Sequence, residues 1–227
     1  MTLPTAPSPI TSEFLIVGEG SGDASFIAHL CQVRGVTGFQ IEDARGESRF
    51  VDHIKGLQSR RGYDRLKAML VVGDNDDGPE DSFGRIRNYL KDAKVPYPDA
   101  TLTVARRDRE GLAVVVMMIP YEAGIPVRGC LETLLLRSLD DGQPRVKACV
   151  DGYRDCLGGA RTRNQEDKLR LRCFVAAMHP EDPNLSLSFV VSPSKGIIDL
   201  NHRSFDEIYR FLAGFSNFCE PRQRGRD

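Results

Sequence analysis

Runs of consecutive apolar residues alternate, along the first half of the chain, with segments whose apolar residues recur every three or four positions. Continuous runs over 13–18, 67–73 and 112–119, and a weaker run over 37–42, predict strands, and the continuous ones are typical of strands buried on both faces of a sheet. The segments that follow the strands predicted over 13–18, 37–42 and 67–73 predict helices, because their apolar residues recur at helical spacing. This alternation predicts an α/β fold with a mostly parallel sheet and helices on both of its faces.

The second half of the chain has a different pattern, in which apolar residues recur mainly at helical spacing from residue 128 onward. Helices are expected over 130–139, within the charged stretch 143–172, and over 205–215. The expected fold class is therefore an α/β, Rossmann-like core with a mainly helical C-terminal extension.

These patterns divide the chain into four parts. They are a flexible leader over 1–12, an α/β core over 13–119, a helical part packed on the core over 120–219, and a disordered tail over 220–227. Within the core, the segment 100–105 is expected to form a hairpin or an edge-strand pair with the run that ends at residue 119, because a charged turn separates the two.

Composition narrows the possible classes of protein. The 227 residues include 31 Lys and Arg against 32 Asp and Glu, a net charge of −1, which excludes a strongly basic nucleic-acid coat but allows a local basic patch. No apolar run reaches the ~18 residues that a membrane helix needs, and the first residues lack the pattern of a signal peptide. Six cysteines without a Cys-x-x-Cys pair predict reduced thiols in a cytoplasmic protein and argue against a zinc site.

Acidic residues follow two of the predicted strands, at the edge of a parallel sheet where ligands bind. Glu19 comes directly after the first strand, and Asp74 and Asp76 follow the third. Asp23 lies four positions after Glu19 and shares a helix face with it if the helix begins by Ser21. Four carboxylates that converge there would repel one another unless a cation lay among them, and hard oxygen ligands suit Mg²⁺ or Mn²⁺.

A simpler interpretation of the acids over 74–77 is ordinary turn and helix-cap chemistry, in which Asp and Asn side chains accept hydrogen bonds from free backbone amides. That interpretation does not explain Glu19, which stands in a glycine-rich turn. Better-known motifs do not fit. The dinucleotide fingerprint lacks its third glycine, a calcium loop would need other residues than Pro79 and Arg85, and neither a Walker lysine nor a Gly-x-Ser-x-Gly motif is present.

Two segments, one around each group of acids, resemble the signature segments of the TOPRIM domain, which topoisomerases, bacterial primases and the overcoming-lysogenization-defect (OLD) nucleases share. They are Phe14-Leu-Ile-Val-Gly-Glu19-Gly-x-x-Asp23 and Leu70-Val-Val-Gly-Asp74-x-Asp76. One strand–helix–strand–helix passage separates them, as in that domain, and the resemblance covers residues 13–119. It implies a TOPRIM-like α/β core.

The rest of the chain resembles a stand-alone TOPRIM-like family related to the OLD nucleases. The matching stretches begin at Ile125, Asp167 and Gly196. In that comparison Glu132 corresponds to a further acidic site residue and Lys168 to the basic residue of the site, with Lys195 as the alternative. The chain departs from the family at Gly18, where a larger apolar residue usually precedes the glutamate.

The resemblance implies phosphodiester cleavage of DNA or RNA with one or two Mg²⁺ or Mn²⁺ ions, which neutralise phosphoryl charge and activate water. The implied roles are Asp74 and Asp76 as principal metal ligands, Glu19 as a ligand or general base, Asp23 and Glu132 as holders of a second ion, and Lys168 as the group that stabilises transition-state charge.

Partners and alternatives remain open from the sequence. Paired arginines at 60–61 and 106–107 are candidates for phosphate contacts, although charged turns are usually only solvated surface. OLD nucleases usually carry an ATPase domain, which this sequence lacks, so a partner protein would supply targeting or energy. Two other functions are possible. One is a non-catalytic sensor that binds a metal or nucleotide, and the other is an accessory protein whose acids are structural and whose helices bind a partner.

Overall fold

A four-stranded sheet in which every strand is parallel to its neighbours forms the centre of the molecule. The computed structural model describes residues 8–108, 111–159 and 161–220. The strand order is β2-β1-β3-β4, and the predicted α/β class is confirmed. The strands are β1 (Phe14–Gly18), β2 (Phe39–Asp43), β3 (Ala68–Asp74) and β4 (Ala113–Ile119).

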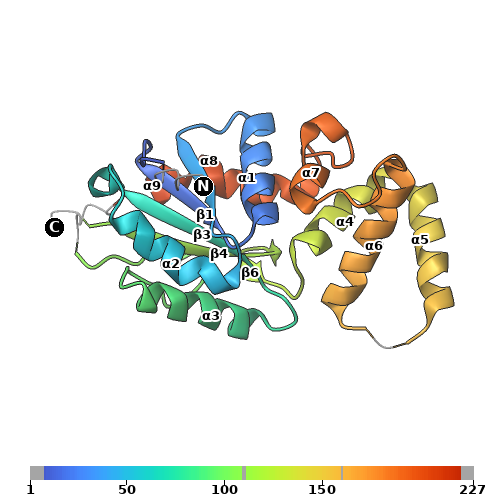
Figure 1. The fold of residues 1–227 in the computed structure, drawn as a ribbon, viewed down its shortest axis with the longest axis horizontal. Helices are drawn as coiled ribbons and strands as arrows, with labels where there is room; N and C mark the ends of the chain where they lie inside the picture. Colours follow the sequence, from blue (N-terminus) through green and yellow to red (C-terminus); the bar gives the residue numbers. More distant parts are fainter. Residues whose placement is uncertain (1–7, 109–110, 160, 221–227) are drawn as a thin grey trace, which may run out of the picture.

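Helices cover both faces of this sheet, because β1, β3 and β4 are apolar on both sides. Helix α1 (Ser21–Arg34) packs on one face, and helices α2 (Glu47–Gln58) and α3 (Pro79–Asp92) pack on the other (Figure 1). Successive residues of β1 point to opposite faces, so that Ile16 joins the core under α1 while Leu15 joins the core under α2 and α3.

The C-terminal half is mainly helical, as predicted. Its helices are α4 (Leu131–Gly142), α5 (Pro144–Leu157), α6 (Arg163–Met178), α7 (Leu187–Val190), α8 (Asp206–Ala213) and α9 (Phe215–Phe218). The described residues also form a small hairpin of β5 (Tyr121–Glu122) and β6 (Ile125–Pro126), and three short 3₁₀ turns at Tyr63–Arg65, Pro193–Lys195 and Arg203–Phe205. The apolar cluster under α1 continues without a break into α4, α6 and α8. Among the residues described, no helix is long and apolar enough to cross a membrane.

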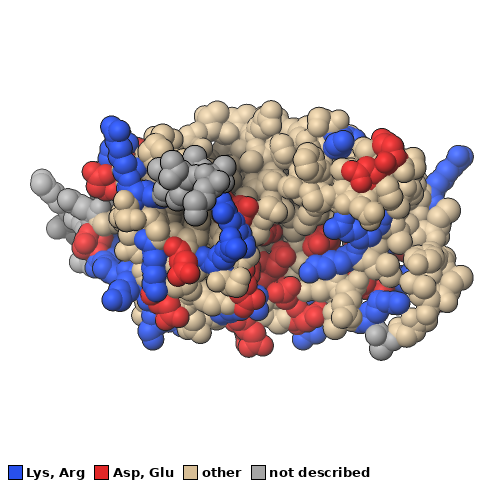
Figure 2. Space-filling model, in the orientation of Figure 1, with Lys and Arg blue, Asp and Glu red and all other residues tan. Residues whose placement is uncertain are grey.

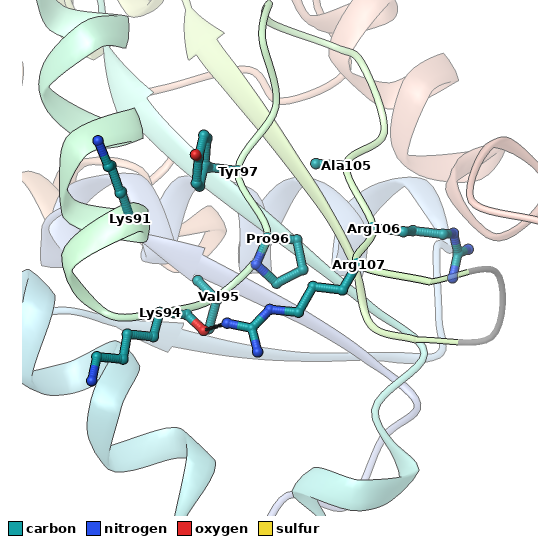
Figure 3. Close-up of a pocket in the computed structure, with 8 residues that line it drawn as sticks. All are labelled: Lys91, Lys94, Val95, Pro96, Tyr97, Ala105, Arg106 and Arg107. Atoms are coloured by element: carbon teal, nitrogen blue, oxygen red, sulfur yellow. Dashed lines mark hydrogen bonds between the residues drawn. The ribbon is translucent and has the colours of Figure 1, made fainter.

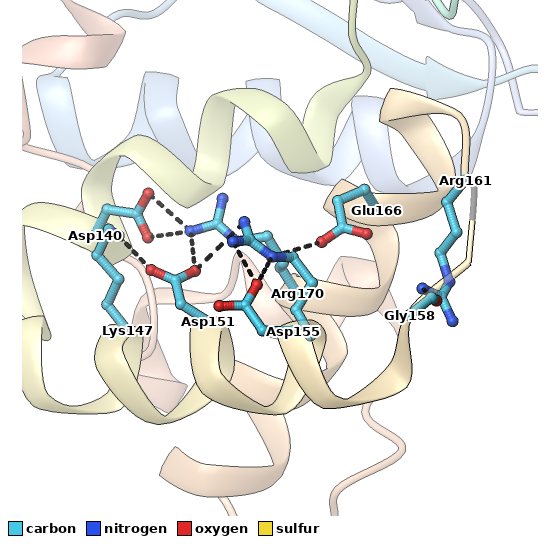
Figure 4. A network of polar contacts seen from close by, with 9 residues as sticks. Asp140, Lys147, Asp151, Asp155, Gly158, Arg161, Glu166 and Arg170 are labelled. Carbon is cyan, nitrogen blue, oxygen red and sulfur yellow. Dashed lines mark hydrogen bonds and ion pairs between the residues drawn. The ribbon is translucent and has the colours of Figure 1, made fainter.

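Helix α5 has one buried residue, Val150, and two ion pairs among the described residues join it to α6. Arg170 of α6 bonds the carboxylate of Asp140 at 2.9 Å and lies 3.6 Å from Asp151 of α5 (Figure 4). Arg154 of α5 lies 3.6 Å from Glu166 of α6. Since Arg170 is only 14 % exposed, its pairs are screened less by salt than a surface pair would be.

The prediction of a strand over 100–105 is wrong. The segment makes three backbone hydrogen bonds to β4: the N–H of Leu102 donates to Val116, and Ala105 and Val114 donate to each other in an isolated antiparallel bridge. Leu102 has a φ of 53°, the left-handed region, which interrupts the extended backbone that a strand needs.

The prediction of a flexible leader over 1–12 is wrong for residues 8–12, because Ile10 is 1 % exposed within the core under α2 and α3. Its backbone N–H donates to the carbonyl of Arg61 at 2.9 Å, and the N–H of Thr11 donates to Gln40 at 2.8 Å. Residues 1–7 of that leader and 221–227 of the predicted tail lie outside the described residues.

Candidate functional site

The carboxyl ends of β1 and β3 bring the first two predicted acids together. Gly18, the last residue of β1, is in register with Val72 of β3, and the backbone N–H of Glu19 donates to the Val72 carbonyl at 2.9 Å. The backbone N–H of Asp74 in turn donates to the carboxylate of Glu19. The strand register therefore fixes Glu19 and Asp74 as neighbours.

Asp23 reaches the same end of the sheet because α1 begins close behind β1. Its Oδ2 accepts a hydrogen bond from the N–H of Gly20 at 2.9 Å. This close approach depends on Gly18, since a Cβ atom there would lie 2.6 Å from the backbone nitrogen of Ala24. Gly18, where the chain departs from the family that it resembles, is therefore required by the contact between β1 and α1. Asp23 itself is only 8 % exposed.

Helix α4 adds a fourth element to the cluster. The N–H of Leu131, in its first turn, donates to Oδ1 of Asp74 at 2.8 Å. The next residue, Glu132, is half-buried and close enough to raise the pKa values of both Asp23 and Asp74. The first turn of a helix favours a carboxylate, because its free N–H groups carry partial positive charge. Figure 2 shows acidic side chains gathered over the middle of this face.

The buried carboxylates resist ionisation. Burial is the largest cause, and the charges of Glu19 and Glu132 add to it, raising the pKa of Asp23 to about 7. Burial, with the charges of Asp23 and Glu132, also raises the pKa of Asp74 well above its ordinary value. Burial raises the pKa of Glu19 too, against an opposing effect of Arg85. The cluster therefore stores electrostatic repulsion when all its members are ionised.

Asp76 lies at the edge of the cluster and is paired with two groups that the sequence analysis did not single out as site residues. Its Oδ2 accepts from Arg85 of α3 at 3.2 Å, and its Oδ1 accepts from Nδ2 of Asn164 of α6 at 2.7 Å. Its backbone adopts a φ of 51° and its carbonyl accepts from the N–H of Gly129 at 2.8 Å. No sequence signal links Asn164 to this site, but Arg85 lies in the helix that directly follows the acidic turn.

Lys168 comes next to this cluster from α6, one helical turn after Asn164. Burial lowers the pKa of Lys168, but the negative charges of Glu132, Asp74 and Asp76 outweigh it, so that the pKa lies above its ordinary value. Lys195, the alternative basic residue, lies in the turn Pro193–Lys195 and is exposed.

The geometry is not that of a ready-made metal centre. Within the described parts of the chain, no three Asp, Glu, His or Cys side chains are grouped closely enough to hold one ion. Asp23, Asp74 and Glu19 each use a carboxylate oxygen to accept a backbone N–H. One further oxygen has no donor: Oδ1 of Asn164 is buried and accepts no hydrogen bond from any described group.

Comparison with known proteins gives one match. A family described as "Protein of unknown function (DUF3226)" matches residues 12–217, which covers both the sheet and the C-terminal helices. No curated protein and no solved structure matches the chain significantly.

Proposed function

The chain belongs to the DUF3226 family, and we propose that it is a TOPRIM-type nuclease, which hydrolyses phosphodiester bonds of DNA or RNA with Mg²⁺ or Mn²⁺. The observation that carries this proposal is the convergence of five carboxylates from β1, α1, β3 and α4, of which the buried Asp23 and the half-buried Asp74 repel each other. A fold keeps such repulsion where a positive ligand relieves it.

The donor set fits a hard divalent cation. Glu19, Asp23, Asp74 and Glu132 offer carboxylate oxygens, and the buried Oδ1 of Asn164 offers an amide oxygen without a hydrogen-bond donor. A cation would require these carboxylates to lie closer together than they do here, and the side-chain torsions of Glu19 and Glu132 allow that movement. When bound, such an ion would polarise a phosphoryl oxygen and lower the pKa of a bound water.

The residues of the chain supply the remaining chemistry. Glu19, whose pKa is raised by burial, is the candidate to accept a proton from the attacking water. The Nζ of Lys168 is the candidate to stabilise negative charge on the phosphoryl oxygens, because it lies within the field of the carboxylates and keeps its proton. Arg85 compensates the charge of Asp76 and fixes its orientation.

A hollow of about 660 Å³ lies beside the turn that follows Asp76 and offers space for a nucleotide next to the cleaved bond; its lining holds three carboxylates and one cation, namely Glu80, Asp81, Asp99 and Arg128. Gly78 and Pro79, just after Asp76, line one side of it, and Arg128, just before α4, lines another. Arg128 is exposed and suited to a phosphate contact.

The test is a cleavage assay with Mg²⁺ or Mn²⁺ on supercoiled plasmid, linear duplex, single-stranded DNA and RNA. We expect the wild type to cleave at least one of them, and Asp74→Asn to lose at least about 100-fold in rate, because the substitution removes a charge from the metal site. An Asp52→Asn variant, purified identically, is the matched control, since Asp52 lies in α2 away from the cluster.

Cleavage by both variants at the wild-type rate would contradict the assignment of Asp74. Equal cleavage by the wild type and Asp74→Asn, with cleavage also unaffected by EDTA, would point to a contaminating nuclease.

A second candidate function is a non-catalytic module that binds a cation or nucleotide as a sensor. The pairing of Asp76 with Arg85 and Asn164 favours it, since a carboxylate that is already neutralised is less available to the second of the two ions that two-metal catalysis uses. Lys168→Gln separates the two functions. A nuclease should lose about 100-fold in rate while its melting temperature still rises with Mn²⁺, whereas a sensor shows that rise without any cleavage.

A further inference from the structure

A basic hollow lies at the opposite end of the sheet from the carboxylates, between the end of α3 and the segment that precedes β4 (Figure 3). Its volume is about 410 Å³. Four of its eight lining residues are cations and none is acidic; the cations are Lys91, Lys94, Arg106 and Arg107. Tyr97, 38 % exposed, adds an aromatic ring to the lining.

Among the described residues, no ion pair joins a carboxylate to the cations that line this hollow. The guanidinium of Arg107 donates to the carbonyl of Lys94, and Arg106, which points away from the hollow, donates to the carbonyl of Gly111 at 2.5 Å (Figure 3). Carbonyl acceptors orient these groups without cancelling their charge. Lys91 and Lys94 are exposed, and no carboxylate of the described residues forms an ion pair with either.

Helix α3 sets the distance between this hollow and the carboxylate cluster. The helix has 14 residues, begins at Pro79 just after Asp76, and ends at Asp92 between the two lysines. At 1.5 Å per residue its length is about 20 Å. A duplex rises 3.4 Å per base pair along each strand, so the same distance corresponds to about six base pairs.

We propose that this hollow binds backbone phosphates of a nucleic acid and anchors it about 20 Å from the carboxylate cluster. The proposal rests on the proposed function, since it assigns the same substrate class. Phosphate contacts position a chain without reading its sequence, and each neutralised phosphate releases counterions, so affinity should fall steeply with salt. Substrates shorter than about six base pairs would reach only one of the two sites.

The test measures binding without cleavage, by fluorescence anisotropy of a labelled duplex of about 30 base pairs in EDTA at several salt concentrations. Lys91→Gln/Lys94→Gln removes two cations from the rim. Lys55→Gln/Arg145→Gln removes two exposed cations elsewhere and is the matched control. We expect the first variant to weaken binding about 10-fold and to reduce the slope of log K against log salt by about 2, with the control unchanged.

Several outcomes would overturn the proposal: no binding by the wild type, equal weakening in both variants, or loss of inorganic tripolyphosphate binding in Lys91→Gln/Lys94→Gln with duplex binding intact. The last result would assign the hollow to small phosphorylated molecules. The binding assay does not depend on cleavage, because EDTA removes the cation. Weaker duplex binding by Lys91→Gln/Lys94→Gln therefore supports the basic hollow as a phosphate site even if the wild type cleaves nothing. In that case only the proposed nuclease activity would fail.

Discussion

The two ends of the four-stranded sheet carry charge of opposite sign and hold it in different ways. At the carboxyl end, Asp23 is buried and Asp74 half-buried among other acids, and each accepts a hydrogen bond from a backbone N–H. At the amino end, Lys91 and Lys94 lie exposed on the rim of a hollow. The first arrangement costs folding free energy, because ions lose their hydration on burial, whereas the second costs little.

The contrast in burial indicates which kind of ligand each end of the sheet suits. Buried acids recover free energy when a cation enters among them, so their affinity is expected to be tight and pH-dependent. Exposed lysines attract an anion through a water-filled space, so their affinity is expected to be weak per contact and sensitive to salt. Three measurements test this contrast between the two ends.

The largest effect is expected from pH, in metal-free buffer. The pKa of Asp23 is about 7 in the folded protein and 3.8 ordinarily, so between these values the folded state binds more protons than the unfolded state. The unfolding free energy should therefore fall as pH rises from about 4 to 7, by on the order of a few kcal/mol, and then level off. Urea denaturation at pH 5 and pH 8 measures this fall.

Asp23→Asn is the variant that isolates the effect, because its amide oxygen still accepts from Gly20 but carries no charge. We expect it to be more stable than the wild type at pH 8 and to show a smaller fall between pH 5 and pH 8. Glu42 does not interfere: its pKa is lowered to about 2, so its stabilisation is complete above about pH 4.5. Identical pH profiles for the two proteins would show that Asp23 is not perturbed.

A smaller effect is expected from Gly18→Ala. The added Cβ would lie 2.6 Å from the backbone nitrogen of Ala24, so α1 must shift away from β1. Such overpacking costs about 1–3 kcal/mol, measured by urea denaturation. Gly84→Ala, at a helical position with open space around the new Cβ, is the control and should not destabilise. A Gly18→Ala protein as stable as the wild type would mean that α1 does not need this close contact.

The smallest effect is expected at the basic end. Lys91→Gln/Lys94→Gln should change the unfolding free energy by no more than about 0.5 kcal/mol, because both side chains are exposed. Thermal unfolding at low and high salt measures this. If the variant is more stable than the wild type at low salt but not at high salt, the cations of the hollow repel one another strongly. The hollow would then store electrostatic repulsion, as the carboxylate cluster does.

Most of the sheet could be predicted from the sequence, because β1, β3 and β4 are continuous apolar runs and only burial on both faces produces that pattern. The segment 100–105 misled the prediction because its composition suits a strand, while the backbone of Leu102 lies in the left-handed region. Ile10 was missed because one apolar residue among prolines carries no periodicity.

The site could be predicted only where acids follow strands. Glu19 and Asp74 are fixed by strand register, which the apolar runs reveal. Arg85 and Asn164 could not be predicted as site residues, because their contact with Asp76 depends on how α3 and α6 pack in three dimensions. Their pairing with Asp76 is the main feature of the cluster that the sequence did not indicate.

The hydrogen bonds that complete the carboxylate cluster also bear on the order in which the chain can fold. Leu131 is 57 positions from Asp74, and Asn164 is 88 positions from Asp76. Contacts across such long loops form slowly, because the entropy of closing the loop is lost before the contact is gained. On the ribosome, the strands that carry Glu19 and Asp74 emerge before α4 and α6 have been made. A growing chain therefore carries Asp74 without Leu131 until synthesis has passed the start of α4, and Asp76 without Asn164 until it has passed the start of α6.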